Sequence, residues 1–308
     1  MKKELMSGNE AIARGVYEAG VRFAAAYPGT PSTEIMEQFA RYDGVYAEWA
    51  PNEKVAVEVA IGAALGGAKA LAVMKHVGVN VAADPIFTVS YTGIEGALVI
   101  ISADDPSMHS SQNEQDNRNY AKFAKIPMLE PSDPQEAKEY VKLAFAISEQ
   151  FDTPVFLRTT TRVSHSKSVV TLSEPRVPED KTALAHHAAK YVMVPINARI
   201  RRVEVEKRQK ALQKFAETFP ENKMEINDPA VGIITAGMPY NYAKDVFPDY
   251  SYLKLGMVYP LPVKMIRHFA SRVKKIYVIE ELDPYLEEHF FLMIRRPPRS
   301  TLFPYTNE

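Results

Sequence analysis

The sequence predicts an α/β protein in which a doubly wound parallel sheet is followed by a smaller α/β domain. Short, mostly apolar segments recur through residues 1–160, as is typical of strands that are covered on both faces. Longer segments with helical spacing of their apolar residues separate them. The chain has 308 residues, of which 46% are apolar, so it is long enough for about two domains with sizeable cores.

The first domain is expected to span residues 1–175 and to alternate strands with helices. Its predicted strands are 21–26, 45–50, 70–75, 97–102 and 154–159, and its predicted helices are 32–42, 53–68 and 134–150. In the helix 53–68, the small residues Gly62 and Gly66 share one side with Val55 and Val59, which would permit close packing.

A linker and a second α/β domain are expected to follow. Residues 161–185 are polar without a sustained period, and the linker proper, 176–228, includes a basic helix over 198–219. A charge run of this kind is usually a solvated helix face. The second domain, 229–289, has predicted strands at 231–237, 252–257 and 275–281 and predicted helices near 240–246 and 262–273. The tail, 290–308, contains Pro-Pro and no period, and it resembles translated sequencing-adapter sequence, so we expect it to be non-native and not to pack.

Composition and charge narrow the class of protein. A formal net charge of −1 argues against nucleic-acid or membrane-surface binding, and no apolar run reaches the roughly 18 residues of a membrane span. The start of the chain lacks the apolar core of a secretory signal, so a cytoplasmic location is the default expectation. The sequence contains no cysteine, which excludes disulfides and cysteine-ligated clusters on this chain.

The turn after the strand 21–26 is a candidate ligand site. Pro28 and Gly29 end the strand, and Thr30 is predicted to cap a helix in which Pro31 is the first residue and Glu34 lies in the first turn. Such a turn would aim a hydroxyl and several N–H groups at the sheet edge where α/β proteins bind ligands. An ordinary capped turn is the alternative.

Two further candidates follow neighbouring strands. Glu53 begins a long apolar helix, where a carboxylate is normally a partner of the helix dipole. His76, Val77 and Gly78 follow the strand 70–75, and a satisfied polar residue at a strand end is the alternative for His76.

Several segments together resemble a known enzyme family. They are YPGTPSTEI (27–35), WAPNEKVAVEVAIGAA (49–64), MKHVGVNVAADP (74–85), SADDPSMHSSQNEQDNR (102–118), MVPINAR (193–199), LKLGMVYPLP (253–262) and VIEELDPYLEE (278–288). With them, roughly residues 5–289 resemble the α subunit of indolepyruvate:ferredoxin oxidoreductases, within the thiamine-diphosphate-dependent 2-oxoacid:ferredoxin oxidoreductase family. The resemblance implies a pyrimidine-binding-type first domain and a transketolase C-terminal-like second domain.

The resemblance also assigns roles to the candidate residues. Glu53 would be the activating glutamate, whose carboxyl bonds the N1′ ring nitrogen of thiamine diphosphate. Gly29, His76, Val77 and Gly78 would bind the cofactor with it, and the Thr30 hydroxyl would lie beside the substrate oxygen, as a second catalytic residue.

The group that binds the substrate carboxylate does not transfer from the family. Where related pyruvate enzymes carry an arginine, this chain has Ala103, Asp104 and Asp105, which fits an aryl 2-oxoacid better than pyruvate. His109 and Arg118 are the candidates for substrate binding, with loop capping as the alternative for Asp104 and His109. The spacing of acidic and His residues in 107–116 matches no zinc or calcium site, so no metal is expected there.

The implied activity is oxidative decarboxylation of aryl 2-oxoacids such as indolepyruvate to the acyl-CoA, with electrons passing to ferredoxin. The implied partners are a β subunit, a second α subunit, ferredoxin and coenzyme A.

The chain has no Gly-Asp-Gly motif for the diphosphate and Mg²⁺, and no cysteine for 4Fe-4S clusters. The resemblance therefore implies an N-terminal fragment, inactive alone, with the diphosphate site and the clusters expected in the missing C-terminal part. The alternatives are a stand-alone assembly or binding module and a fragment of a non-redox thiamine enzyme. The sequence beyond codon 289 distinguishes them.

Overall fold

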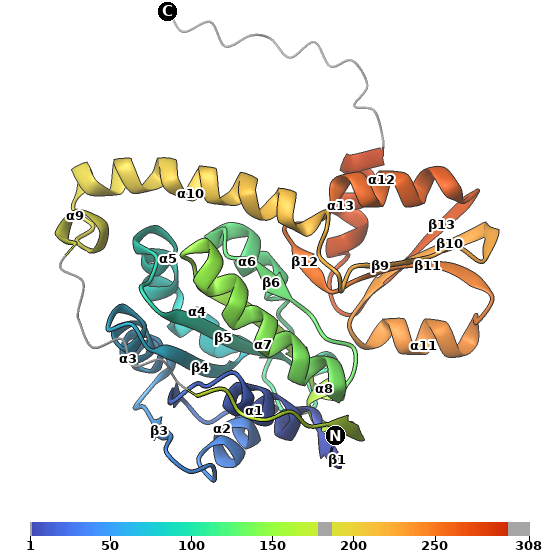
Figure 1. Ribbon diagram of the computed structural model, residues 1–308. Helices are drawn as coiled ribbons and strands as arrows, with labels where there is room; N and C mark the ends of the chain where they lie inside the picture. Colours follow the sequence, from blue (N-terminus) through green and yellow to red (C-terminus); the bar gives the residue numbers. More distant parts are fainter. Residues whose placement is uncertain (1, 178–186, 295–308) are drawn as a thin grey trace, which may run out of the picture.

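A seven-stranded sheet organises the first domain in the computed structural model, which describes residues 2–177 and 187–294 (Figure 1). In spatial order its strands are β12 (Met257–Tyr259), β6 (Met128–Leu129), β7 (Val155–Thr160), β5 (Ala97–Asp104), β4 (Lys69–Lys75), β2 (Phe23–Ala26) and β3 (Tyr46–Trp49). Every neighbouring pair is parallel except β12 with β6. All the strands predicted for this domain are present, with ends shifted by up to two residues.

Helices cover both faces of this sheet. One face carries α1 (Gly8–Glu18), α2 (Thr33–Phe39) and α7 (Pro134–Phe151); the other carries α3 (Glu53–Leu65), α4 (His76–Val81), α5 (Ala83–Thr92) and α6 (Arg118–Ala124). Because side chains alternate along a strand, Val99 packs with the first set and Leu98 with the second. This confirms the doubly wound fold.

A two-stranded antiparallel sheet lies outside the predicted elements. It joins β1 (Lys3–Ser7) to β8 (Lys167–Thr171), which follows α8 (Thr161–His165). The interpretation of residues 161–185 as a linker is therefore wrong for 161–171, and residues 178–185 lie outside the described residues. Each strand finds its partner about 160 residues away along the chain, and neither has an apolar pattern strong enough to show this locally.

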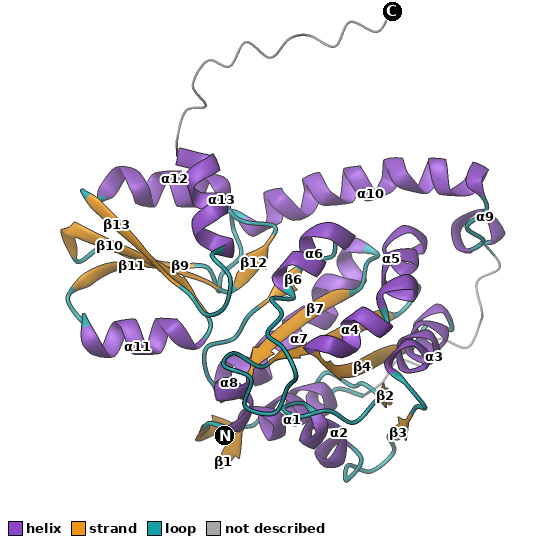
Figure 2. Ribbon diagram, turned by 180° about the vertical axis from the view of Figure 1, so that it is seen from behind, coloured by secondary structure: helices purple, strands orange, loops and turns teal. Residues whose placement is uncertain are grey.

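The second domain has a four-stranded sheet between two helices (Figure 2). Its strands in order are β13 (Lys275–Ile279), β10 (Asp228–Ala236), β11 (Tyr250–Leu255) and β9 (Lys223–Glu225), and its helices are α11 (Met238–Val246) and α12 (Val263–Arg272). β9 comes from the predicted linker, and β12 leaves this domain to pair with β6 of the first. The two domains therefore share a sheet as well as a linker.

The basic segment forms the long helix α10 (Pro195–Ala216), preceded by the short α9 (Ala188–Tyr191). Only part of it is a solvated face. Arg201 donates from Nε to the carbonyl of Tyr91 (2.7 Å), and Arg208 donates to the carbonyl of Asp152 (2.8 Å). These carbonyls lie at the C-terminal ends of α5 and α7, where cations are favoured. Burial lowers the pKa of Arg208 to about 10. Two arginines of α10 thus hold it against the first domain.

The last helix described is α13 (Tyr285–Ile294). The predicted non-packing tail starts at residue 290, but this helix continues without a break to residue 294. Phe290 and Met293 are half-buried against the apolar cluster that runs through both domains. Residues 295–308 of the predicted non-native tail lie outside the described residues. In the part of the chain that is described, no helix has both the length and the apolar character needed to cross a bilayer.

Candidate functional site

Three adjacent parallel strands bring the predicted site residues to one edge of the first sheet. β2 pairs with β3 on one side and β4 on the other, so the segments that follow them begin at the same carboxyl edge. Two close contacts join these segments. A Cβ built on Gly29 would stand 2.9 Å from Cδ of Lys75, and one on Gly78 would stand 2.6 Å from Cγ of Glu53. Val77, between His76 and Gly78, is half-buried.

The turn after β2 differs from the predicted cap. The helix α2 begins at Thr33 with Ser32 as its N-cap, so Thr30 is not the cap; Glu34 does lie in the first turn. Ser32 Oγ donates to the carbonyl of Gly29 (2.8 Å), and the Gly29 N–H donates to Thr33 Oγ1 (2.9 Å). These bonds close the turn without Thr30. Thr30 is exposed, and its hydroxyl bonds no described residue, so capping is not its role.

Glu53 stands at the start of α3 as predicted. Its neighbour Asn52 caps the helix by accepting a hydrogen bond from the N–H of Val55 (3.0 Å). The Glu53 side chain is buried, with the residue only 8% exposed, and it has no hydrogen bond or ion pair with any described residue. A buried carboxylate without a partner is costly. The carboxylate, which packs on Gly78, can therefore accept a hydrogen bond from a ligand.

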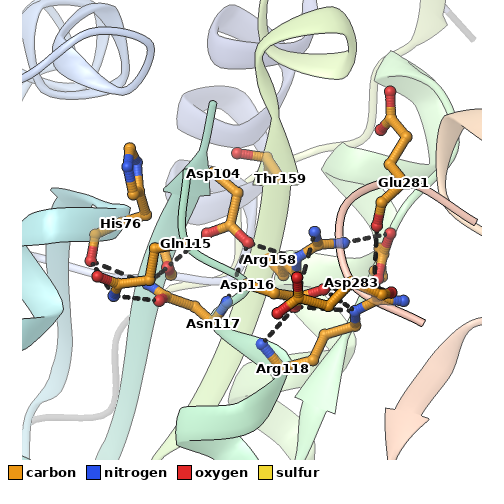
Figure 3. A network of polar contacts seen from close by, with 12 residues as sticks. His76, Asp104, Gln115, Asp116, Asn117, Arg118, Arg158, Thr159, Glu281 and Asp283 are labelled. Atoms are coloured by element: carbon orange, nitrogen blue, oxygen red, sulfur yellow. Dashed lines mark hydrogen bonds and ion pairs between the residues drawn. The ribbon is translucent and has the colours of Figure 1, made fainter. Parts of the chain in front are cut away.

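His76 is completely buried and only partly satisfied. Its Nε2 lies 3.1 Å from the carbonyl oxygen of Asn113. Because a carbonyl only accepts, Nε2 donates, and in the neutral ring Nδ1 is left as an acceptor. That Nδ1 is buried with no partner among the described residues. The main-chain carbonyl of His76 accepts from the side-chain amides of Gln115 and Asn117, both at 3.1 Å (Figure 3). The loop thus fixes His76 and leaves one ring nitrogen for a ligand.

Asp105 organises the loop 105–117 that covers this edge. It accepts hydrogen bonds from the N–H groups of His109 (3.2 Å) and Ser110 (2.8 Å) and from the hydroxyls of Ser111 and Thr161 (both 2.7 Å). Burial alone would raise the pKa of this carboxyl, but these hydrogen bonds outweigh it and lower the pKa to about 2. Asp105 therefore caps the start of the loop, and Asp104 caps its end by accepting from the N–H of Asn117, whereas no capping bond comes from the His109 side chain among the described residues. His109 itself is exposed.

Asp104 lies deeper, at the end of β5. Its Oδ2 accepts from Arg158 Nε (2.7 Å) and from the N–H of Asn117 (3.2 Å). Burial raises the pKa of Asp104 to about 6 in spite of the arginine. Arg158 also pairs with Glu130, with NH1 and Oε1 2.7 Å apart. Asp104 and Arg158 therefore anchor Asn117, which in turn holds His76.

Arg118 does not reach the candidate site, and its prediction as a substrate-binding residue is wrong. The residue is 1% exposed, and every nitrogen of its guanidinium is already occupied. Nε donates to Asp116 (2.9 Å), NH1 to Glu280 (2.7 Å), and NH2 to the carbonyls of Glu281 (2.9 Å) and Asp283 (3.0 Å) (Figure 3). Arg118 joins the loop to the second domain.

The sequence reasoning missed Lys75, Asn113, Gln115 and Asn117. Lys75 ends β4, and its Nζ donates to the carbonyl of Ser110 at 3.2 Å. A lysine at the end of an apolar strand, directly before His76, was the available signal. The amide residues had no comparable signal, because their partners lie across the loop.

Two solved structures share this fold. A 2-oxoglutarate:ferredoxin oxidoreductase from Magnetococcus marinus, solved with 2-oxoglutarate, coenzyme A and succinyl-CoA, shares it with a TM-score of 0.74 and 16% identity over 94% of this chain and 60% of that one. An inactive split-gene transketolase tetramer has a TM-score of 0.59 and 13% identity over 94% of this chain and 84% of its own.

The chain belongs to the pyruvate flavodoxin/ferredoxin oxidoreductase, thiamine diP-binding family, which matches residues 14–228. The indolepyruvate oxidoreductase subunit IorA of Archaeoglobus fulgidus is 46% identical over 304 residues, covering 94% of this chain and 48% of that protein. The protein of the same name from Methanothermobacter marburgensis is 45% identical over 290 residues, covering 91% and 47%. The chain thus spans about half the length of these relatives.

Proposed function

We propose that this chain is part of a subunit of an oxidoreductase that decarboxylates aryl 2-oxoacids such as indolepyruvate to the acyl-CoA and passes electrons to ferredoxin. The observation that carries the proposal is Glu53, a buried carboxylate without a partner among the described residues, packed on Gly78 at the carboxyl edge of the sheet in a chain of this family. The names of the relatives support the indole substrate.

Glu53 would hold thiamine diphosphate through a nitrogen of its pyrimidine ring, with Gly29, His76, Val77 and Gly78 around it. When bound, this cofactor supplies the carbon nucleophile that makes decarboxylation of a 2-oxoacid possible. Glu53 would keep a proton at the ring nitrogen, and His76 Nδ1 would accept a hydrogen bond from the ligand. The exposed hydroxyl of Thr30 would donate to the substrate oxygen.

The remaining parts of the reaction would come from outside this chain. The sequence has neither a Gly-Asp-Gly motif for the diphosphate and Mg²⁺ nor a cysteine for 4Fe-4S clusters. A β subunit and a second α subunit would assemble with this chain. Ferredoxin would accept the electrons, and coenzyme A would accept the acyl group. We propose a cytoplasmic location for the assembled enzyme.

Glu53→Gln in the complete enzyme tests the proposal. We expect indolepyruvate-dependent reduction of ferredoxin to fall by about 10²–10⁴-fold, because the amide cannot exchange the proton. Glu58→Gln, one turn further along α3 and exposed, is the matched control and should keep wild-type turnover. Near-normal turnover of Glu53→Gln would contradict the role of Glu53.

A further inference from the structure

A 2-oxoacid carries a carboxylate beside its reacting carbon, and that carboxylate needs a cation or several N–H donors in the site. Because the Arg118 guanidinium is bound to residues of the second domain, few positively charged side chains of the described residues remain available at the carboxyl edge of the first sheet. Arg158 is paired with Asp104 and Glu130. Lys54 is also paired, with its Nζ 3.2 Å from Oδ2 of Asp84. The candidate edge therefore offers little free positive charge.

Lys75 is the exception among the described cations beside Thr30. No described carboxylate lies within ion-pair distance of its Nζ, and the one hydrogen bond that its ammonium makes goes to the neutral carbonyl of Ser110 (3.2 Å). An ammonium has three N–H donors, so two remain for a ligand. Charge without a carboxylate partner, at a half-buried position, is unusual for a structural lysine.

The lysine is also directed toward the turn that carries Thr30. The methylene chain of Lys75 packs against Gly29, where a Cβ would stand 2.9 Å from Cδ and 3.0 Å from Cγ of the lysine. Ser110, which accepts from Nζ, donates from Oγ to the carbonyl of Thr30 (3.4 Å). The ammonium is therefore held between the turn and the loop, close to the hydroxyl proposed for the substrate oxygen.

We propose that Lys75 binds the carboxylate of the 2-oxoacid substrate, an inference that rests on the proposed function. The rest of an aryl substrate would meet apolar surface at the same edge. Three large apolar side chains remain exposed there: Tyr27 directly after β2, Trp49 at the end of β3 and Met108 on the covering loop. Gly29 serves this arrangement by leaving space for the lysine stem.

Lys75→Met in the complete enzyme tests this assignment against Lys69→Met. Lys69 is the first residue of the same strand, at the opposite edge of the sheet, and pairs with Glu149. We expect Lys75→Met to raise KM for indolepyruvate about 10- to 100-fold with little change in kcat, as loss of a charged hydrogen bond implies. Lys75→Arg should recover most of the affinity, and Lys69→Met should behave as wild type.

A calorimetric titration separates carboxylate binding from a structural role. Wild-type enzyme should bind indole-3-propionate more tightly than its neutral amide, and Lys75→Met should lose that preference. A Lys75→Met enzyme with unchanged KM, or with lowered kcat and an intact carboxylate preference, would overturn the assignment. If the wild-type enzyme oxidises no 2-oxoacid, the proposed function fails, and this assignment with it, whatever the variant does.

Discussion

Two glycines at the carboxyl edge of the first sheet leave room for the charged side chains of the candidate site. The Lys75 side chain packs against Gly29, and the Glu53 side chain packs on Gly78. Three atoms of Glu53 lie 2.6 to 2.9 Å from the position that a Cβ on residue 78 would take. Contacts this short are not tolerated in a packed interior. A side chain at position 78 would therefore displace the carboxylate.

Gly78→Ala should weaken cofactor binding more than it weakens the fold. In the complete enzyme we expect affinity for thiamine diphosphate with Mg²⁺ to fall at least about 10-fold by calorimetry, while overpacking costs about 1–3 kcal/mol of unfolding free energy. Gly62→Ala on the outer side of α3, where a Cβ meets nothing within 4 Å, is the control and should stabilise this chain slightly. Unchanged affinity in Gly78→Ala would show that Glu53 does not hold the cofactor.

At the scale of an element, the loop 105–117 is ordered by one carboxylate. Asp105 is 1% exposed and accepts five hydrogen bonds, two of them from main-chain N–H groups. The same loop holds His76 through Gln115 and Asn117 and meets Lys75 through Ser110. The ionised form of Asp105 therefore supports the part of the loop that contacts Lys75, while Asp104 supports Asn117 at the other end.

The stability of the chain should depend on pH through Asp105. Its pKa is about 2 in the folded chain against 3.8 for the unperturbed group, so the unfolded state binds the proton first as pH falls. The contribution, about 2 kcal/mol at most, is present above about pH 4 and is lost as pH falls through about 2.

Urea unfolding measures this contribution. Asp105→Asn should lower the unfolding free energy at pH 7 by about 1–2 kcal/mol, and the gap to wild type should close toward pH 2. Asp84→Asn removes an exposed surface ion pair and should change stability by less than about 1 kcal/mol. A gap that persists at pH 2 would mean that the Asp105 charge is not the cause.

At the scale of the whole molecule, the two domains are joined through buried charge as well as apolar packing. One apolar cluster runs from the first sheet into the second, with Ile100 and Leu253 among its members. Beside it, Arg118 connects Asp116 of the loop to Glu280 of the second domain. The covering loop is therefore tied to the position of the second domain.

Arg118→Met should destabilise the chain by about 3–5 kcal/mol in urea unfolding, because it leaves two largely buried carboxylates without their cation. Arg162→Met is the matched control. Arg162 also reaches the second domain, but its side chain is 51% exposed and lies 3.7 Å from Glu281, so its loss should cost less than about 1 kcal/mol. Equal costs for the two variants would contradict a buried link between the domains.

Local pattern was enough for much of the fold and for the location of the site. Buried strands such as β4 and β5 and the long helices α3 and α7 follow from apolar spacing, which depends on neighbours in the chain. The turn at Gly29 follows from its place after a strand, because parallel strands bring their carboxyl ends together. The roles predicted for Glu53 and His76 came from the resemblance of their motifs to a known family. The resemblance of these motifs also predicted the family that the chain belongs to.

Tertiary structure alone decided which polar groups have partners. Arg118 looked available because its carboxylate partner in the second domain lies 162 residues further along the chain. Thr30 looked like a cap until Ser32 and Thr33 closed the turn. Lys75 became a candidate only in the folded chain, where no described carboxylate lies within ion-pair distance of its ammonium. The spacing of residues in a sequence indicates the face of an element on which a side chain lies. The oppositely charged partner of that side chain belongs to a distant segment, and only folding brings the two segments together.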